Sequence, residues 1–267
     1  MKRVALALAC AAMLIAADEP KYQSSPARRP VVETRDWGPW GGPFRAGLIP
    51  ALMRDFGERY IYAEANAALP SPAKGERRVV FLGDSITDGW DLAAAFPGQP
   101  YVNRGIGAQV TAQMLLRFEQ DVVALKPAAV VILGGTNDVS GFMQVETPET
   151  ILANVTAMAD IADARGIRVV LGALLPVNDY GEKRGYLTKE RPPATLRAVN
   201  DRLRALAAAR GYAFADYAAA VVDERGLLTD AYTGDGLHPN AAGYARMVPV
   251  ARAAIAEALA RPARNAR

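Results

Sequence analysis

Cysteine and histidine are nearly absent from this chain. Among its 267 residues there is one cysteine, Cys10, and one histidine, His238. A single cysteine cannot form an intramolecular disulfide or build a cysteine-rich zinc site. A single histidine gives poor support for a zinc site, and it leaves any reaction that needs an imidazole base with one candidate.

The N-terminus has the pattern of a secretory signal peptide. Lys2 and Arg3 precede an uninterrupted apolar run, residues 4–17, that ends in small residues. This run is shorter than the ~20 residues that a membrane-spanning helix needs. We therefore expect cleavage after Ala17, a secreted or periplasmic protein, and no stable insertion in a membrane. Cleavage before Cys10, which would make a lipoprotein, is the less favoured alternative.

Excess charge of one sign is also missing. The chain has 31 Lys and Arg residues against 28 Asp and Glu residues, a formal net charge of +3. Removal of residues 1–17 takes away two of these basic residues, which leaves a net charge of +1, and it also removes the only cysteine. Such a balance gives no basis for binding nucleic acid or an anionic membrane surface.

The segment 18–50 is rich in Pro, Gly and Arg and has no helical or strand period, which predicts a loop or wrapping arm. Its aromatic residues Trp37, Trp40 and Phe44 are expected mainly to pin the arm to the body, with ligand stacking as the alternative. Residues 52–69 have a helical pattern. We expect this N-terminal part to pack on the rest of the chain.

Residues 71–267 are expected to form one α/β domain, against which residues 18–70 pack. Short apolar runs alternate here with longer segments of helical period. This alternation predicts a mainly parallel sheet covered by helices on both faces. The expected strands are 79–82, 101–103, 129–133, 167–171 and 212–217, and the expected helices are 112–125, 150–165, 194–210 and 240–260.

Polar and glycine-rich segments follow three of these strands and precede the last helix. In an open parallel sheet the ligand lies beyond the carboxyl ends of the strands, so these segments are the candidates for chemistry. They are Gly83-Asp84-Ser85-Ile86-Thr87-Asp88, Asn103-Arg104-Gly105-Ile106-Gly107-Ala108, Gly134-Gly135-Thr136-Asn137-Asp138 and Asp235-Gly236-Leu237-His238-Pro239-Asn240.

Ser85 and His238 form the candidate nucleophile and base. A serine hydroxyl needs a base to take its proton, and His238 is the only near-neutral base in the chain. Asp235 lies three residues before His238, so a tight turn can bring its carboxylate to the imidazole Nδ1. The alternatives are a structural histidine and an aspartate that only forms a turn.

Acyl transfer also needs donors for the oxyanion that develops on the substrate. Asn137 directly follows a strongly apolar strand, where its amide could face the site; a plain turn residue is the alternative. The backbone N–H groups of Ser85 and of the turn at 105–108 could supply the other donors.

Together these segments resemble the four sequence blocks of the SGNH (GDSL-type) hydrolase family, in the same order. The resemblance covers about 78–260. It implies a flavodoxin-like three-layer α/β/α sandwich with a central five-stranded sheet, and ester hydrolysis without a cofactor or metal. It also implies that Ser85 is the nucleophile and an oxyanion donor, that Asn137 is the side-chain donor, and that Asp235 and His238 complete a triad.

One position departs from the family pattern. Members often have two glycines where this chain has Gly107 and Ala108, and the second glycine gives its N–H to the oxyanion hole. Ala108 keeps that N–H, so we expect it to be the third donor. Its methyl group could narrow the pocket, or strain the turn if φ is positive there.

Four other readings compete with a serine hydrolase of this family. A dinucleotide site would need a third glycine where Val110 stands. The nucleophile turn of the α/β-hydrolases would need a glycine at Thr87. Metal binding by Asp84, Asp88, Asp235 and His238 lacks paired ligand spacing. A binding protein that keeps the fold without turnover remains open because of Ala108, and acyl transfer to an alcohol would use the same residues as hydrolysis.

The substrate is constrained only loosely by the sequence. The polar loop 174–193 and the arm 37–44 are the expected pocket walls, because loops carry specificity on a rigid scaffold. Export and an exposed site favour short-chain or acetyl esters, including those of carbohydrates. The oligomeric state is not readable from the sequence.

Overall fold

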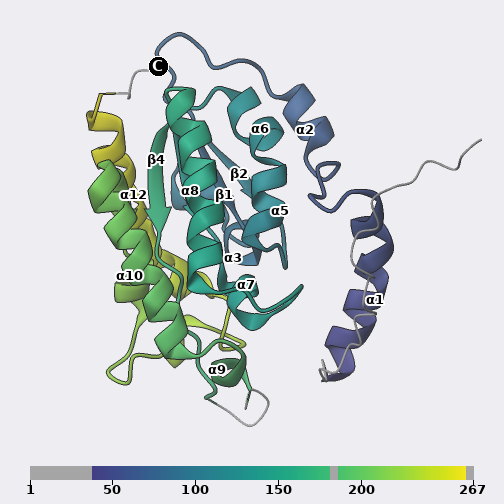
Figure 1. Ribbon diagram of the computed structural model, residues 1–267. Coiled ribbons are helices and arrows are strands. Elements are labelled where there is room, and N and C mark those ends of the chain that lie inside the picture. Colours follow the sequence, from purple (N-terminus) through teal and green to yellow (C-terminus); the bar gives the residue numbers. More distant parts are fainter. Residues whose placement is uncertain (1–37, 181–185, 263–267) are drawn as a thin grey trace, which may run out of the picture. The chain divides into compact units, whose positions relative to one another are not determined.

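The computed structural model describes residues 38–180 and 186–262 (Figure 1). The predicted signal peptide, with Cys10, and the arm up to Trp37 lie outside these residues. The chain divides into two units, Met1–Ala46 and Gly47–Arg267, and the second contains the whole sheet. Within the described residues, none of the helices has the length and apolar character needed to cross a membrane.

The fold is built on a five-stranded, all-parallel sheet, as the alternating pattern predicts. The strand order is β2-β1-β3-β4-β5. The expected number of strands and their direction are confirmed. The strands are β1 (Val79–Gly83), β2 (Tyr101–Gly105), β3 (Ala129–Leu133), β4 (Arg168–Gly172) and β5 (Ala213–Ala215).

Helices cover both faces of this sheet. Parallel crossovers are right-handed, so the β1–β2 connection lies on the face opposite the connections that lead from β2 to β5. One face therefore carries α3 (Ser85–Asp88) and α4 (Leu92–Ala95), and the other carries the helices listed next. They are α5 (Thr111–Leu116), α6 (Phe118–Asp121), α8 (Pro148–Ala164) and α10 (Pro193–Arg210). The last helix, α12 (Ala241–Ala260), packs on β3, β4 and β5 and beside α4 and α11 (Tyr217–Val221).

The central strands are apolar because both of their faces are covered. Every residue of β1 and β3 is buried, and their side chains form the middle of the hydrophobic core. The sheet runs in opposite directions from β1, to β2 on one side and to β3 on the other. Such a switch point opens a crevice at the carboxyl ends of the strands, which here are Gly83, Gly105 and Leu133 in register.

The N-terminal part differs from the expectation. The pattern predicts a loop over 38–50, but α1 covers Gly38–Arg54, in a segment whose glycines and prolines have the lowest helix propensities. The single helix predicted over 52–69 is divided, because only the end of α1 and α2 (Ala63–Ala68) are helical. Between them the Asp55 carboxylate accepts from the Arg59 N–H (2.7 Å), and Glu58 has a φ of 52°, which turns the chain.

Three further segments differ from the pattern. The helix predicted over 112–125 is broken at Arg117 into α5, α6 and the short 3-10 helix η1 (Val123–Leu125). The strand predicted over 212–217 ends at Ala215, and α11 follows. The predicted polar loop after β4 begins with apolar residues that are buried in the core (Leu174, Leu175 and Val177), and it contains α9 (Leu187–Glu190).

Candidate active site

Ser85 lies at the first position of α3, directly after β1. The side chain of Asp84 caps this helix by accepting from the Ile86 N–H (2.9 Å). Gly83 lets the strand turn into the helix, because a Cβ there would lie 2.0 Å from Thr87 Oγ1 and 2.6 Å from the Leu133 carbonyl oxygen. The sequence Gly83-Asp84-Ser85 therefore places a half-buried hydroxyl at the switch point of the sheet.

The structure brings His238 and Asp235 to Ser85. His238 Nε2 lies 2.9 Å from Ser85 Oγ, and His238 Nδ1 lies 2.6 Å from Asp235 Oδ2. An ionised carboxylate can only accept, so Nδ1 carries the proton and Nε2 is free to accept from the Ser85 hydroxyl. Asp235 Oδ1 also accepts from the backbone N–H groups of Leu237 (2.9 Å) and His238 (2.8 Å).

These contacts keep Asp235 ionised. Partial burial of the carboxylate raises its pKa, but the hydrogen bonds from the His238 side chain and from the two backbone N–H groups outweigh it. The net effect is a pKa well below the usual range of an aspartate. A permanent negative charge therefore faces Nδ1 and fixes the tautomer of the imidazole.

Thr233 and Asn178, which the sequence analysis did not single out, hold the turn from 235 to 238. The Thr233 hydroxyl donates to the His238 carbonyl (2.8 Å) and accepts from the Gly236 N–H (2.9 Å). The backbone N–H of Asn178 donates to the Gly236 carbonyl (2.9 Å). A Cβ at Gly236 would lie 2.4 Å from the Asn178 carbonyl oxygen, so only glycine fits at this contact. No motif in the sequence marks either residue, because their role depends on this packing.

Asn137 lies in α7 (Thr136–Ser140), which directly follows β3 and a glycine with a φ of 130°. Its side chain is 5% exposed, and its Nδ2 donates to the backbone carbonyl of Gln109 (3.0 Å). The next residue, Asp138, is fully buried and accepts from the Thr111 N–H (3.0 Å) and from the Thr111 hydroxyl (2.5 Å). The segment after β3 is therefore tied to the turn that follows β2.

Ala108 lies in this turn after β2, with a φ of 64°. This φ lies in the left-handed region, which favours glycine. The backbone strain considered for Ala108 in the sequence analysis is therefore present. Ala108 directly precedes Gln109, the residue whose carbonyl accepts from Asn137. The two further oxyanion donors expected from the sequence, Ala108 and Asn137, are thus neighbours in the structure.

The sequence also matches a known protein family. Residues 81–246 match the model of the GDSL-like lipase/acylhydrolase family. The chain belongs to this family. The resemblance stated from the four sequence blocks is therefore confirmed.

Solved structures of other proteins share the fold. A GDSL-like lipase from Bacteroides thetaiotaomicron is 37% identical, with a TM-score of 0.70 over 76% of this chain and 100% of that chain. A variant of an acetyl xylan esterase from Geobacillus stearothermophilus is 22% identical, with a TM-score of 0.53 over 68% of this chain and 94% of its own, a likeness of fold alone.

A curated relative outside the solved structures is the lipoprotein YqeF of Bacillus subtilis. It is 28% identical over an alignment of 123 residues, which covers 39% of this chain and 51% of that protein. The match therefore spans about half the length of the relative.

Asp84, a buried carboxyl group, directly precedes Ser85. Asp84 is 1% exposed, and burial raises its pKa to about 6, although the Ile86 N–H and the nearby His238 and Arg191 act in the opposite direction.

Asp84, Asp88, Asp235 and His238 were the residues of the metal alternative. Over 38–180 and 186–262 the structure contains no cluster of three or more histidine, cysteine or acidic side chains arranged to hold a metal ion.

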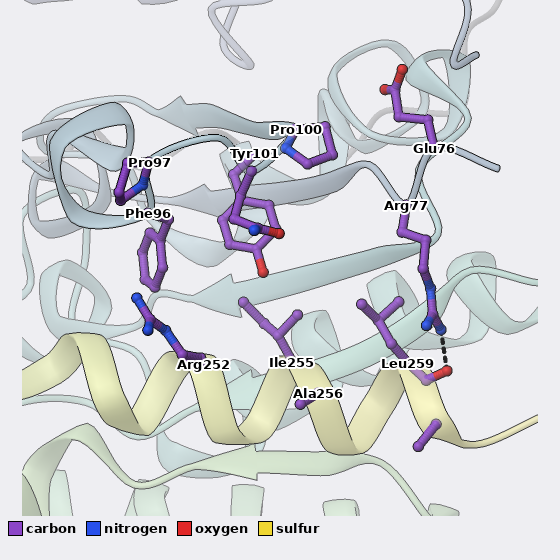
Figure 2. Close-up of a pocket in the computed structure, with 12 residues that line it drawn as sticks. Glu76, Arg77, Phe96, Pro97, Pro100, Tyr101, Arg252, Ile255, Ala256 and Leu259 are labelled. Atoms are coloured by element: carbon purple, nitrogen blue, oxygen red, sulfur yellow. Dashed lines mark hydrogen bonds between the residues drawn. The ribbon is translucent and has the colours of Figure 1, made fainter. Parts of the chain in front are cut away.

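Two open cavities flank the sheet in the described part of the chain. One, of about 690 Å³, lies between α4 and the first half of α12; Trp90, Tyr244 and Pro239, the residue after His238, are among its lining residues. The other, of about 810 Å³, lies at the amino ends of β1 and β2, where Tyr101 and Arg252 face it (Figure 2). This second cavity is therefore at the end of the sheet away from Ser85.

The predicted pocket walls are only partly described. Trp37, the Trp40 side chain and residues 181–185 of the loop after β4 lie outside the described residues. Phe44 is 47% exposed on α1. Their part in substrate binding stays a prediction.

Proposed function

We propose that this protein is a serine ester hydrolase in which Ser85 is the nucleophile and His238 the general base. The observation that carries the proposal is the unbroken series of contacts from Ser85 Oγ to His238 Nε2 (2.9 Å) and from His238 Nδ1 to Asp235 Oδ2 (2.6 Å). Both distances are within hydrogen-bonding range. Membership of the GDSL-like lipase/acylhydrolase family supports the same reaction class.

The first half of the reaction forms an acyl-enzyme. His238 takes the proton of the Ser85 hydroxyl as the oxygen attacks the ester carbonyl, and the imidazolium is stabilised by Asp235. The tetrahedral intermediate then collapses, the C–O bond to the alcohol breaks, and His238 gives its proton to the leaving oxygen. In the second half, water attacks the acyl group with His238 again as base, which releases the acid and restores Ser85.

Three N–H donors are proposed for the oxyanion. They are the backbone N–H groups of Ser85 and Ala108 and the side-chain amide of Asn137. Nδ2 of Asn137 has two hydrogens, and the Gln109 carbonyl accepts one of them (3.0 Å), so the other remains for the substrate oxygen. Removing one such donor typically lowers kcat by about 10²–10³-fold.

Short-chain or acetyl esters, including those of carbohydrates, are the proposed substrates. The openness of the site to solvent supports this choice over long lipids, because the His238 side chain is 39% exposed. A secreted or periplasmic location is part of the proposal. It is supported by the N-terminal sequence pattern and by the name of the lipoprotein relative.

The deciding experiment is hydrolysis of p-nitrophenyl esters from acetate to palmitate by the wild type and by Ser85→Ala. We expect the highest kcat/KM on acetate or butyrate and a loss of kcat of about 10⁶-fold in the variant. Asn137→Ala should lose about 10²–10³-fold on the same ester. Transfer to an added sugar would appear as an acylated sugar product, which separates acyl transfer from hydrolysis.

A binding protein without turnover is the second candidate, and the φ of 64° at Ala108 is the observation that favours it. A folded wild-type protein that hydrolyses none of the esters would refute hydrolysis of simple esters. Restoration of turnover by Ala108→Gly would then show that the turn after β2 is what impairs the site.

A further inference from the structure

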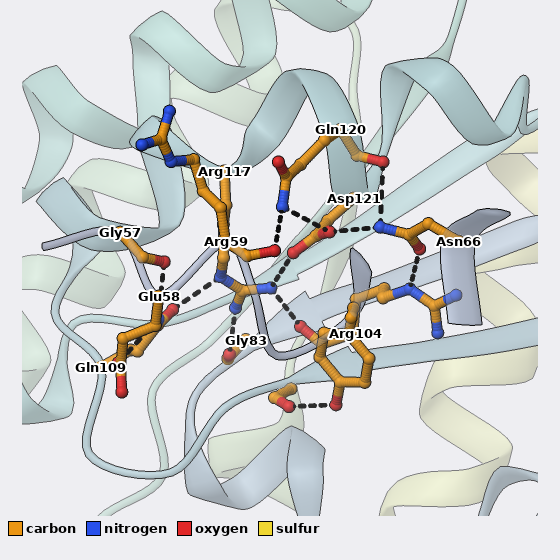
Figure 3. Close-up of polar contacts among 12 residues, drawn as sticks. Gly57, Glu58, Arg59, Asn66, Gly83, Arg104, Gln109, Arg117, Gln120 and Asp121 are labelled. Atoms are coloured by element: carbon orange, nitrogen blue, oxygen red, sulfur yellow. Dashed lines mark hydrogen bonds and ion pairs between the residues drawn. The ribbon is translucent and has the colours of Figure 1, made fainter. Parts of the chain in front are cut away.

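A buried cluster of polar side chains joins the carboxyl ends of β1 and β2 to the turn that precedes α5 (Figure 3). Its central member is Arg117, whose side chain is 0% exposed and pairs with the equally buried Asp121 (3.1 Å). Removing a cation from water is expensive unless its N–H groups all find partners. The partners of Arg117 therefore show what this cation holds in place.

Three of the partners belong to segments that carry the site. Arg117 Nη2 donates to the Gly83 carbonyl (2.9 Å), two residues before Ser85. Its Nη1 donates to the Arg104 carbonyl (2.8 Å) near the end of β2. Its Nε donates to Oε1 of Gln109 (2.6 Å). One planar guanidinium thus connects the end of the nucleophile strand, the end of β2 and the turn that contains Ala108.

Gln109 extends this connection to the amide of Asn137. The Gln109 side chain is 0% exposed and held at both ends, because its Nε2 also donates to Glu58 Oε2 (3.0 Å) and to the Gly57 carbonyl (3.2 Å). Its backbone carbonyl accepts from Asn137 Nδ2 (3.0 Å). Fixing the Gln109 side chain therefore fixes the acceptor that orients the Asn137 amide.

The helix also breaks at Arg117. Arg117 has φ and ψ of −101° and 3°, and it separates α5 from α6 where the sequence period predicts one continuous helix. Buried ion pairs can often be replaced by apolar residues without loss of stability. Helix continuity and general stability therefore give no reason for an arginine here, whereas its contacts with the site segments do.

We propose that Arg117 is a positioning residue for the hydrolytic reaction. Through Gln109 it sets the Asn137 amide relative to Ser85, and through the Gly83 carbonyl it anchors the strand that carries Ser85. This inference rests on the proposed roles of Ser85 and Asn137. Arg117 itself does not touch the substrate.

The test compares Arg117→Lys with Arg78→Lys as a matched control. Arg78 is also buried (4% exposed), but it precedes the amino end of β1, where it donates to the carbonyls of Leu125 (3.1 Å) and Pro70 (2.9 Å). Lysine keeps the charge in both variants and removes the planar fork. For Arg117→Lys we expect kcat to fall by roughly 10- to 100-fold with little change in KM, since a small displacement of an oriented group has effects of this size.

The control variant should lose thermal stability and keep its kcat. Equal losses of kcat in the two variants, or an unchanged kcat in a folded Arg117→Lys protein, would overturn the proposal. Gln109→Met removes the side-chain amide that accepts from Arg117 Nε, while all other contacts of Arg117 remain. If Arg117→Lys does not fold, the same fall in kcat is expected of Gln109→Met.

A double-mutant cycle separates this route from general destabilisation. In an Asn137→Ala background, Arg117→Lys should cost much less than in the wild type, because the group that it positions is already missing. If the fold-losses of kcat of the two single variants multiply in the double variant, Arg117 does not act through Asn137.

The side-chain amide signal of Asn137 in a ¹H–¹⁵N spectrum gives a readout that needs no turnover. The signal is assigned by its disappearance in Asn137→Asp. We expect it to shift in Arg117→Lys and in Gln109→Met and to stay in place in Arg78→Lys. If the wild type hydrolyses no ester, the proposed function fails, and this signal still decides whether Arg117 positions the amide; an unchanged signal refutes it.

Discussion

Ala108 combines a required backbone position with an unfavourable side chain. Its φ is 64°, and among the non-glycine residues of the described chain only Glu58 and Lys126, both at 52°, also have a positive φ. An L-residue in this region costs about 1–2 kcal/mol because its Cβ crowds the backbone. The turn keeps this conformation because Arg117, Asn137 and Gln109 hold the residues around it.

Ala108→Gly should therefore stabilise the protein. Glycine removes the strain, and part of the gain is offset by the greater freedom of the unfolded chain, so we expect about 1 kcal/mol. For a protein of this size that is a rise in Tm of roughly 2–4 °C, measured by calorimetry. Ala95→Gly, in the helix α4, provides the opposite control and should lower Tm. A lower Tm for Ala108→Gly would show that the turn is not strained.

Asp84 makes stability depend on pH. Burial raises its pKa from 3.8 to about 6 in the folded protein. Between these values the folded protein holds a proton that the unfolded chain has lost, so the contribution of Asp84 to stability is highest below pH 3.8 and is lost as the pH rises through 6. The loss has an upper bound of roughly 3 kcal/mol.

Asp84→Asn removes this penalty and keeps an oxygen to accept from the Ile86 N–H. Relative to the wild type, we expect the variant to gain stability steadily between pH 4 and pH 7 in urea unfolding. Asp91→Asn is the control, because Asp91 caps α4 in the same way from an exposed position. A difference between Asp84→Asn and the wild type that does not change with pH would contradict the assignment.

At the scale of elements, the turn between η2 (Asp230–Tyr232) and α12 delivers the imidazole to Ser85. A bridge between Thr233 and Pro239 closes this turn. Inside the turn, the Thr233 hydroxyl donates to the His238 carbonyl and accepts from the Gly236 N–H. The position of His238 therefore depends on the Thr233 side chain, which bonds to the backbone of the turn.

Thr233→Val should remove these hydrogen bonds and leave the shape of the side chain nearly unchanged. We expect a loss of about 1–3 kcal/mol of stability and a lower kcat on the same ester as the wild type. The control is Thr147→Val, since Thr147 caps α8 by accepting from the Thr150 N–H (3.2 Å) and should cost only stability, about 1 kcal/mol. Equal kcat values in the two variants would show that the turn does not need the Thr233 hydroxyl.

The elements with long apolar runs were predictable from the sequence, and the short ones were not. The runs at 79–82 and 129–133 predict β1 and β3 to within a residue, because strands buried on both faces need such runs. Four-residue helices such as α3 and α4 are too short to show a period. The break at Arg117 was missed because tertiary hydrogen bonds, which the local pattern does not contain, end α5 there.

The same distinction applies to the site. Residues with reactive side chains beside strand ends could be named from the sequence, and the structure places His238 within hydrogen-bonding distance of both Ser85 and Asp235. Residues that hold them, such as Thr233, Gln109 and Arg117, are ordinary polar residues in the sequence. Only the fold shows what they contact.

At the scale of the whole molecule, the candidate site is assembled from segments far apart in the chain. Ser85 and His238 are separated by 153 residues. They meet because Ser85 follows β1 and His238 precedes α12 at the same edge of the sheet. The sheet thus acts as the common frame for loops that have no direct connection.

The N-terminal pattern leads to a prediction for the mature chain. Expressed in a bacterium as the full 267-residue chain, the protein should be recovered outside the cytoplasm with Asp18 as its first residue, because cleavage after Ala17 fits the apolar run best. Intact mass and N-terminal sequencing measure this. A chain that begins at Cys10 and carries a lipid would instead support the lipoprotein alternative, and a full-length cytoplasmic chain would exclude both.

Trp90 gives the molecule a built-in optical reporter. It is 3% exposed and stacks on Tyr244 (ring centroids 5.4 Å apart), whose hydroxyl donates to the Ile86 carbonyl (2.8 Å) beside Ser85. The chain has three tryptophans, and the other two, Trp37 and Trp40, precede Gly47. With both replaced by phenylalanine, intrinsic tryptophan fluorescence would come from one indole near α3, the helix that begins with Ser85, so ligand binding there could be followed without a chromogenic ester.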